Sequence, residues 1–117
     1  MHFLLLIHET PGKVPAMGTP EQKAYWDEWG RVSQAMQDAG AMVLGAPLAP
    51  VTEAVSVRPT GHAVGPFGAG EDMLTGYLVI EAPDLAAATA WADRLPNVLA
   101  GSGGVEVRAA VPMAVPA

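Results

Sequence analysis

Cysteine is absent from this chain of 117 residues. Its absence excludes disulfide bonds, thiolate metal sites and cysteine nucleophiles, and it agrees with a location in the reducing cytoplasm. Basic residues are scarce, because six Lys and Arg stand against twelve Asp and Glu and give a net charge of −6. An acidic surface repels phosphate backbones and anionic lipids, so we expect neither nucleic acid nor a membrane surface as a partner.

Long apolar runs are also lacking. The N-terminal run Phe3–Ile7 is five residues long and no Lys or Arg precedes it. A signal peptide needs a longer apolar stretch, and a membrane span needs about 20 residues. Half of the residues are nevertheless apolar and 15% are charged, a composition typical of folded chains. The sequence therefore predicts a soluble, cytoplasmic protein with one hydrophobic core.

Hydrophobic periodicity predicts strands and helices in alternation. Residues 2–8 carry apolar side chains on both faces, which indicates a strand that is covered on both sides. Thr19 is placed to cap the first helix, Gln22 to close its capping box, and Gly40 to stop it. Asp84 is placed to cap the second helix. The expected strands are 2–8, 41–48, 54–58, 62–64, 76–82 and 105–111, and the expected helices are 20–39 and 85–95.

The order of these elements is a split β-α-β pattern with a hairpin inserted near residues 54–64. This pattern predicts an α+β fold of the ferredoxin-like class, in which two helices cover one face of an antiparallel sheet. Because the other face is also apolar, we expect a second copy of the chain to cover it and form a homodimer. Residues 1–111 are expected to form one domain, and residues 112–117 a frayed tail.

Two histidines are candidates for acid/base chemistry. His8 ends the first strand beside a mobile Pro-Gly loop, and an imidazole in such a place can exchange protons near neutral pH. The alternative is a buried imidazole that bonds a backbone carbonyl. Glu9 points to the opposite face of the strand, so it does not automatically pair with His8. His62 lies in the turn before the glycine-rich loop and either lines a pocket or is exposed to solvent.

Several other residues are candidates for catalysis or for substrate contacts. Asp72 is the third catalytic candidate, as a residue that assists His8; with Glu71 it either caps a short helical turn or places a carboxylate at a pocket mouth. Arg108 either pairs with Glu106 on one strand face or binds a substrate carboxylate or enolate. The hydroxyl of Tyr77 either donates to a ligand or packs in the core.

Aromatic residues add to this set. Trp26 either walls an apolar pocket or anchors a dimer contact. Phe67 belongs to the glycine-rich loop and joins Trp26, Tyr77 and Arg108 as a substrate-binding candidate.

Recognised cofactor motifs are missing. The three histidines have no metal-ligand spacing, residues 65–70 match neither phosphate-binding pattern, and no serine elbow is present. We therefore expect no metal and no cofactor. The chemistry that remains is acid/base catalysis in a dry pocket.

The sequence resembles the YCII-related family, in its DGPF-type branch, over about residues 2–111. The blocks that carry the resemblance are Phe3–Ile7, Gly65-Pro66-Phe67, Gly76–Ala82, Asp84-Leu85, Ala90-Trp91-Ala92 and Val105–Arg108. The resemblance implies a dimeric α+β barrel with a cleft between the sheet and the partner subunit.

One departure from the family pattern bears on function. Val64 stands where the family's Asp-Gly-Pro-Phe motif has its aspartate, and His8 stands where relatives often carry tyrosine. The resemblance thus implies either a specialised enzyme, for instance of secondary metabolism, or a relative that binds without catalysing. The first hypothesis is a cofactor-independent lyase, isomerase or cyclase that acts on an apolar carbonyl- or phenol-containing molecule. The alternatives are a small-molecule-binding or regulatory accessory protein and a purely structural dimer.

Overall fold

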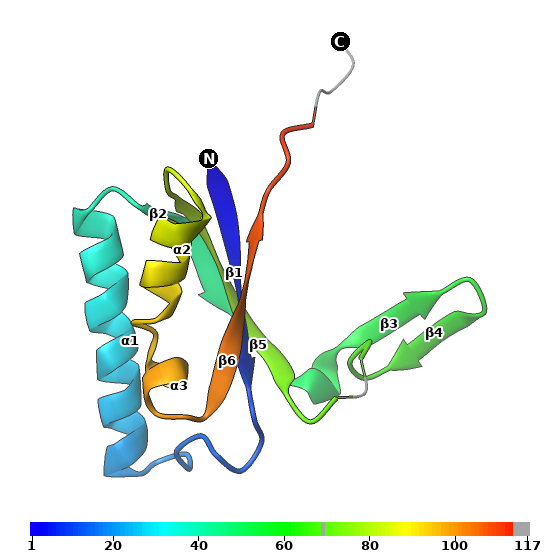
Figure 1. Ribbon diagram of the computed structural model, residues 1–117. Helices are drawn as coiled ribbons and strands as arrows, with labels where there is room; N and C mark the ends of the chain where they lie inside the picture. The colour runs from blue at the N-terminus through cyan, green and yellow to red at the C-terminus, as the bar shows by residue number, and fades with distance from the viewer. Residues whose placement is uncertain (69, 114–117) are drawn as a thin grey trace.

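The computed structural model describes residues 1–68 and 70–113 (Figure 1). Six strands and three α-helices follow one another along the described chain, together with one 3-10 turn. They are β1 (His2–Glu9), α1 (Pro20–Asp38), β2 (Met42–Pro47), η1 (Val51–Glu53), β3 (Val55–Arg58), β4 (Gly61–Val64), β5 (Met73–Glu81), α2 (Leu85–Ala92), α3 (Pro96–Leu99) and β6 (Gly103–Ala109).

Four of the strands form one antiparallel sheet in the order β2-β5-β1-β6. All three helices lie on one face of this sheet (Figure 1). The core fills the space between the sheet and the helices, and its most buried large side chains include Phe3, Leu5, Met36, Ile80 and Leu95. The α+β fold of the ferredoxin-like class is therefore confirmed.

Helix caps account for where the helices begin. The Thr19 hydroxyl accepts a hydrogen bond from the Gln22 backbone N–H at 3.2 Å, and the Asp84 carboxylate accepts one from the Ala87 N–H at 2.8 Å. The Gln22 side chain accepts from the Gly18 N–H at 2.8 Å, one residue earlier than a capping box requires. Gly40 follows the first helix with φ +70°, the left-handed conformation that suits glycine.

The helical segment after Asp84 differs from the expectation. A single helix was expected to reach residue 95, but α2 ends at Ala92 and a separate short helix, α3, begins at Pro96. Proline has no N–H to continue a helix, whereas it fits the first turn of a new one. Residues 96–99, which follow the expected helix, are therefore helical as well.

Strands β5 and β6 both begin earlier than expected. Because Met73 already pairs with Glu9, β5 starts at Met73 and no helical turn follows Asp72. Strand β6 starts at Gly103, where an added Cβ would lie 2.0 Å from the His8 carbonyl oxygen. Only glycine allows β6 to approach β1 this closely.

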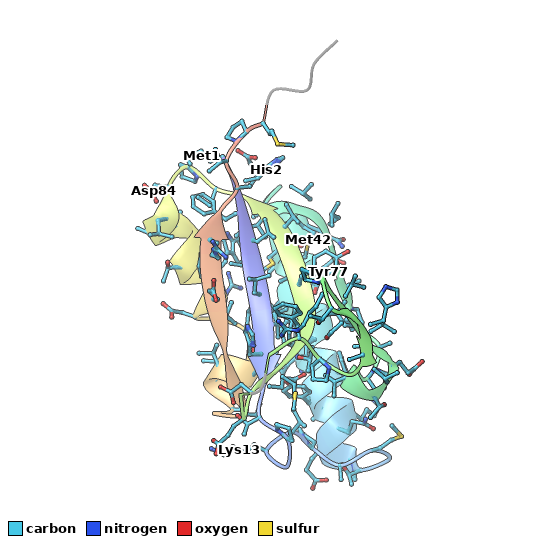
Figure 2. The ribbon with its side chains drawn as sticks, turned by 90° about the vertical axis from the view of Figure 1, so that its right-hand side faces the viewer. Met1, His2, Lys13, Met42, Tyr77 and Asp84 are labelled. Atoms are coloured by element: carbon cyan, nitrogen blue, oxygen red, sulfur yellow. The ribbon has the colours of Figure 1, made fainter. Side chains whose placement is uncertain are left out.

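No described helix or strand packs over the sheet face turned away from the helices, apart from the end of the face at His8 and Leu74, where the segments at the base of the β3-β4 hairpin adjoin it. Figure 2 looks onto this face, with β1 between β6 and β5. Leu4, Leu6 and Val79 are partly buried there, and Leu44 is 50% exposed. The two-faced apolar pattern of β1 therefore corresponds to a core face and an open face.

Strands β3 and β4 form a hairpin arm that projects beyond the open face (Figure 1). Val55 pairs with Val64 and Val57 pairs with His62, so these four side chains share one face of the arm. The hairpin prediction is confirmed. Of the predicted tail, residues 114–117 lie outside the described residues. Among the described helices, none has the length and apolar character that crossing a bilayer requires.

Candidate active site

The end of β1 presents two adjacent polar side chains to opposite sides of the sheet. Strand alternation directs Phe3, Leu5 and Ile7 into the core, and Glu9 follows them on the helix side. His8 lies on the open side and is partly buried. The predicted separation of these two side chains is therefore confirmed, and each residue lines a different hollow.

The hollow beside His8 lies between the sheet, at the position where His8 pairs with Leu74, and the base of the hairpin arm. It has a volume of about 440 Å³. Most of its walls are apolar, and its polar side chains are His8, Glu53 and Asp72. The other residues that line it are Leu48, Ala49, Pro50, Val51, Ala54, Pro66, Phe67, Gly68, Gly70, Met73 and Leu74. The structure thus brings together His8, Asp72 and Phe67, three of the seven residues that the sequence suggested.

Asp72 is tied to the chain that follows β1. The Thr10 hydroxyl donates to the Asp72 Oδ1 atom at 2.6 Å, and the Thr10 backbone N–H donates to the Ser102 carbonyl at 2.8 Å. Within residues 1–68 and 70–113, no hydrogen bond joins His8 directly to Asp72. The Asp72 carboxylate therefore lines the hollow and is held by Thr10, which lies two residues after His8 in the chain.

Asn97 anchors the backbone of His8 from the core. This side chain is fully buried, and its Nδ2 group donates to the His8 carbonyl at 3.0 Å and to the Gly104 carbonyl at 2.9 Å. The amide therefore joins α3 to the ends of β1 and β6. Sequence reasoning missed this residue, because nothing in the surrounding residues distinguishes it from a solvated loop asparagine.

The loop at Phe67 folds back onto the arm. The Arg58 guanidinium lies 3.9 Å from the centre of the Phe67 ring, and its Nη2 group donates to the Phe67 carbonyl at 3.3 Å. Ser56, on the same arm face as Arg58, donates its hydroxyl to the Gly65 carbonyl at 2.9 Å. His62 points to the other face of the arm, is exposed and does not line the hollow.

A second hollow lies on the helix side of the sheet, between α1 and the edge strand β2, with a volume of about 420 Å³. Trp26, suggested as a substrate contact, lines this hollow and not the one at His8. Tyr77, also suggested as a substrate contact, borders this hollow too, but it pairs with Leu6, so strand alternation directs its side chain to the open sheet face. Glu9 lines it as well and accepts a hydrogen bond from the Tyr25 hydroxyl. Burial, together with that bond to Glu9, raises the pKa of Tyr25 to about 12.

Arg108 and Val64 lie away from both hollows. Arg108 Nε is 3.4 Å from a Glu106 carboxylate oxygen on the open sheet face, which is the ion pair that the sequence allowed. Val64 is 80% exposed on the arm. Within the described residues, no group of three His, Asp or Glu side chains is placed to hold a metal ion.

The sheet order, the helices on one face and the two hollows define a small α+β domain of the ferredoxin-like class. The chain belongs to the YCII-related domain family, whose model matches residues 1–114.

A solved structure of similar fold is that of 5-chloro-2-hydroxyhydroquinone dehydrochlorinase from Burkholderia phenoliruptrix AC1100, in complex with 2,5-dihydroxybenzoquinone. The two chains are 16% identical and superpose with a TM-score of 0.56, over 95% of this chain and 94% of that chain. At this level of identity the likeness concerns the fold. No curated protein matches the sequence.

Proposed function

We propose that the protein is a small cofactor-independent acid/base enzyme of the lyase, isomerase or cyclase type. The observation that carries this proposal is that His8 and Asp72 line one largely apolar hollow. A dehydrochlorinase is a lyase, and the similar fold of such an enzyme supports this class of reaction for the present chain. The Gly65-Pro66-Phe67 loop supports a place in the DGPF-type branch of the family.

His8 is the general base in this proposal. Its imidazole takes a proton from a phenolic hydroxyl, or from the carbon next to a carbonyl group. The released electron pair forms a new double bond, and in an elimination the leaving group departs with its own bonding pair. The imidazolium then returns its proton to solvent, or to another atom of the substrate in an isomerisation. Asp72 lines the same hollow and supplies the carboxylate that attracts the imidazolium.

The hollow suits an apolar substrate that carries a carbonyl or phenol group. Phe67 and Leu74 supply apolar walls, and a volume of about 440 Å³ accommodates a single-ring or two-ring compound. Apolar walls exclude water and strengthen the interaction between the base and the developing charge.

The protein forms a homodimer in this proposal. The open sheet face carries Leu4, Leu6, Leu44 and Val79, an apolar surface that a second copy of the chain covers sheet to sheet. His8 lies at the end of the same face, so the partner subunit also closes the hollow toward solvent. Sedimentation velocity tests the assembly: we expect twice the mass of one chain, and a monomer at micromolar concentration would contradict it.

Native mass spectrometry tests the reaction. The protein is incubated with a metabolite extract, and we expect a bound molecule to be released with altered mass. His8→Gln should retain the molecule and lose the conversion. His2→Gln is the matched control, because His2 lies on the same strand and face but far from the hollow. If His8→Gln converts the molecule at the wild-type rate, His8 is not the general base. If the wild-type protein retains the molecule without converting it, the result favours the alternative of a small-molecule-binding protein.

A further inference from the structure

The hollow between α1 and β2, which we call the helix-side groove, has two glycines, Gly45 and Gly76, in the strands that line it. Gly45 of β2 pairs with the core-facing Leu78, and Gly76 of β5 pairs with the core-facing Ile7. A Cβ at Gly45 would lie 2.5 Å from a Leu78 methyl carbon and 2.8 Å from the Tyr77 carbonyl oxygen, so glycine is required there. The side chains of Leu78 and Ile7 approach these two positions and contribute apolar surface to the groove.

Aromatic rings form the wall that α1 contributes. Trp26 and Trp29 both line the groove, and Trp26 is 49% exposed. The Tyr25 ring meets them edge to face, with ring centroids 5.9 Å from Trp26 and 6.3 Å from Trp29. Such contacts hold the indoles in place. An indole face attracts cations, because its π-system carries partial negative charge.

A carboxylate stands at one end of the groove. One oxygen of Glu9 accepts a hydrogen bond from the Tyr25 hydroxyl. Because the pKa of Tyr25 is raised to about 12, this phenol keeps its proton and remains a donor at neutral pH. The other oxygen of Glu9 has no hydrogen-bond partner within the described chain, and no Lys or Arg there forms a salt bridge with Glu9.

We propose that the helix-side groove is a second binding site, which takes a primary organic ammonium ion with a flat apolar body. The ammonium group donates to the free Glu9 oxygen, and the apolar body lies against Trp26 and Trp29. The volume of about 420 Å³ accommodates a ring with a short side chain. The net charge of −6 favours cations over anions at this surface. This site lies across the sheet from His8 and does not depend on the reaction proposed there.

The test uses three probes that differ only in the polar end: phenethylammonium, 2-phenylethanol and 3-phenylpropionate. Binding to the full chain is followed at pH 7 through the NMR signals of the indole N–H groups. We expect saturable shifts for Trp26 and Trp29 with phenethylammonium. Trp91 lies on α2 outside the groove and provides an internal reference that does not shift. The alcohol should bind about 10-fold more weakly, since a hydrogen bond to a charged group is the stronger kind, and the carboxylate should not saturate.

Variants separate the groove from the rest of the surface. Glu9→Gln keeps an acceptor for Tyr25 and should remove the preference for the amine over the alcohol. Ser33→Leu fills the groove from α1 and should abolish binding of both probes. Glu21→Gln is the control, because Glu21 is an exposed carboxylate at the start of α1 that does not line the groove.

The proposal is overturned if the carboxylate probe binds as tightly as the amine, or if Glu9→Gln retains the preference. It is also overturned if phenethylammonium leaves Trp26 and Trp29 unshifted while it binds elsewhere on the protein. Should Glu9→Gln fail to fold, Ser33→Leu decides the matter, because unchanged amine affinity in that variant contradicts a site in the groove.

Discussion

Replacing Asn97 with alanine removes the two hydrogen bonds that join α3 to β1 and β6. The Nδ2 group donates to the His8 and Gly104 carbonyls at 3.0 and 2.9 Å, and the side chain is fully buried. Each bond contributes about 1 kcal/mol net, and a buried carbonyl left without a partner costs about 1–3 kcal/mol more. The Asn97 Oδ1 atom has no partner within the described chain, so removing it offsets part of the loss. We expect the free energy of unfolding to fall by roughly 3 kcal/mol.

Urea unfolding at pH 7, followed by circular dichroism, measures this loss against a total of about 5–15 kcal/mol typical of small domains. Asn97→Asp should be at least as destabilising, since it removes the donor and directs a carboxylate at two carbonyl oxygens. Ser102→Ala is the control. The Ser102 hydroxyl is buried nearby but lies 3.5 Å from the Asn97 carbonyl, so its removal should cost less than about 1 kcal/mol. A loss below about 0.5 kcal/mol for Asn97→Ala would refute the assigned role.

Three further predictions follow from buried or closely packed groups. The pKa of Tyr25, raised to about 12, exceeds the value near 10 of an unfolded tyrosine. The stability that it contributes is complete below about pH 10 and is lost as the pH rises through about 12. Wild-type unfolding free energy should therefore fall more steeply than that of Tyr25→Phe in this range, and parallel curves would contradict the shift. Thr75→Val should leave stability unchanged or raise it by about 1 kcal/mol in urea unfolding, because the Thr75 hydroxyl is buried and has no partner within the described chain; a loss above that size would reveal a partner. Gly103→Ala should abolish cooperative thermal unfolding, since its Cβ would lie 2.0 Å from the His8 carbonyl, and a wild-type transition would show that β6 can move away.

The parts of the fold that depend on local chemistry were predictable. Thr19 and Asp84 have the residue type and position of helix caps, and both act as caps in the structure. The alternation in β1 likewise predicted that His8 and Glu9 separate onto opposite faces. A helix was expected to continue as far as residue 95, but α2 already ends at Ala92. The new helix that begins at Pro96 depends on packing of α3 against β6, which no local pattern shows.

Only part of the candidate site could be predicted from the sequence. His8 and Phe67 were identified from their residue types and loop context, and both line the hollow between the end of β1 and the base of the arm. Trp26 was assigned to the same site, yet α1 and the open face are separated by the sheet itself, so it lines the helix-side groove instead. Asn97 contacts residues remote along the chain, and such a contact appears only when the fold is known.

The hairpin arm divides the chain into two halves whose strands interleave. Strands β1 and β2 come before the arm, whereas β5 and β6 come after it, and the sheet order is β2-β5-β1-β6. Each of the three pairings in the sheet therefore joins a strand of the first half to a strand of the second. If the chain is cut at the arm tip, between Thr60 and Gly61, neither fragment contains two strands that are neighbours in this sheet. The fragments 1–60 and 61–117 should thus remain unfolded apart and assemble one to one when mixed, which makes the arm a natural place to split the protein into a complementing pair.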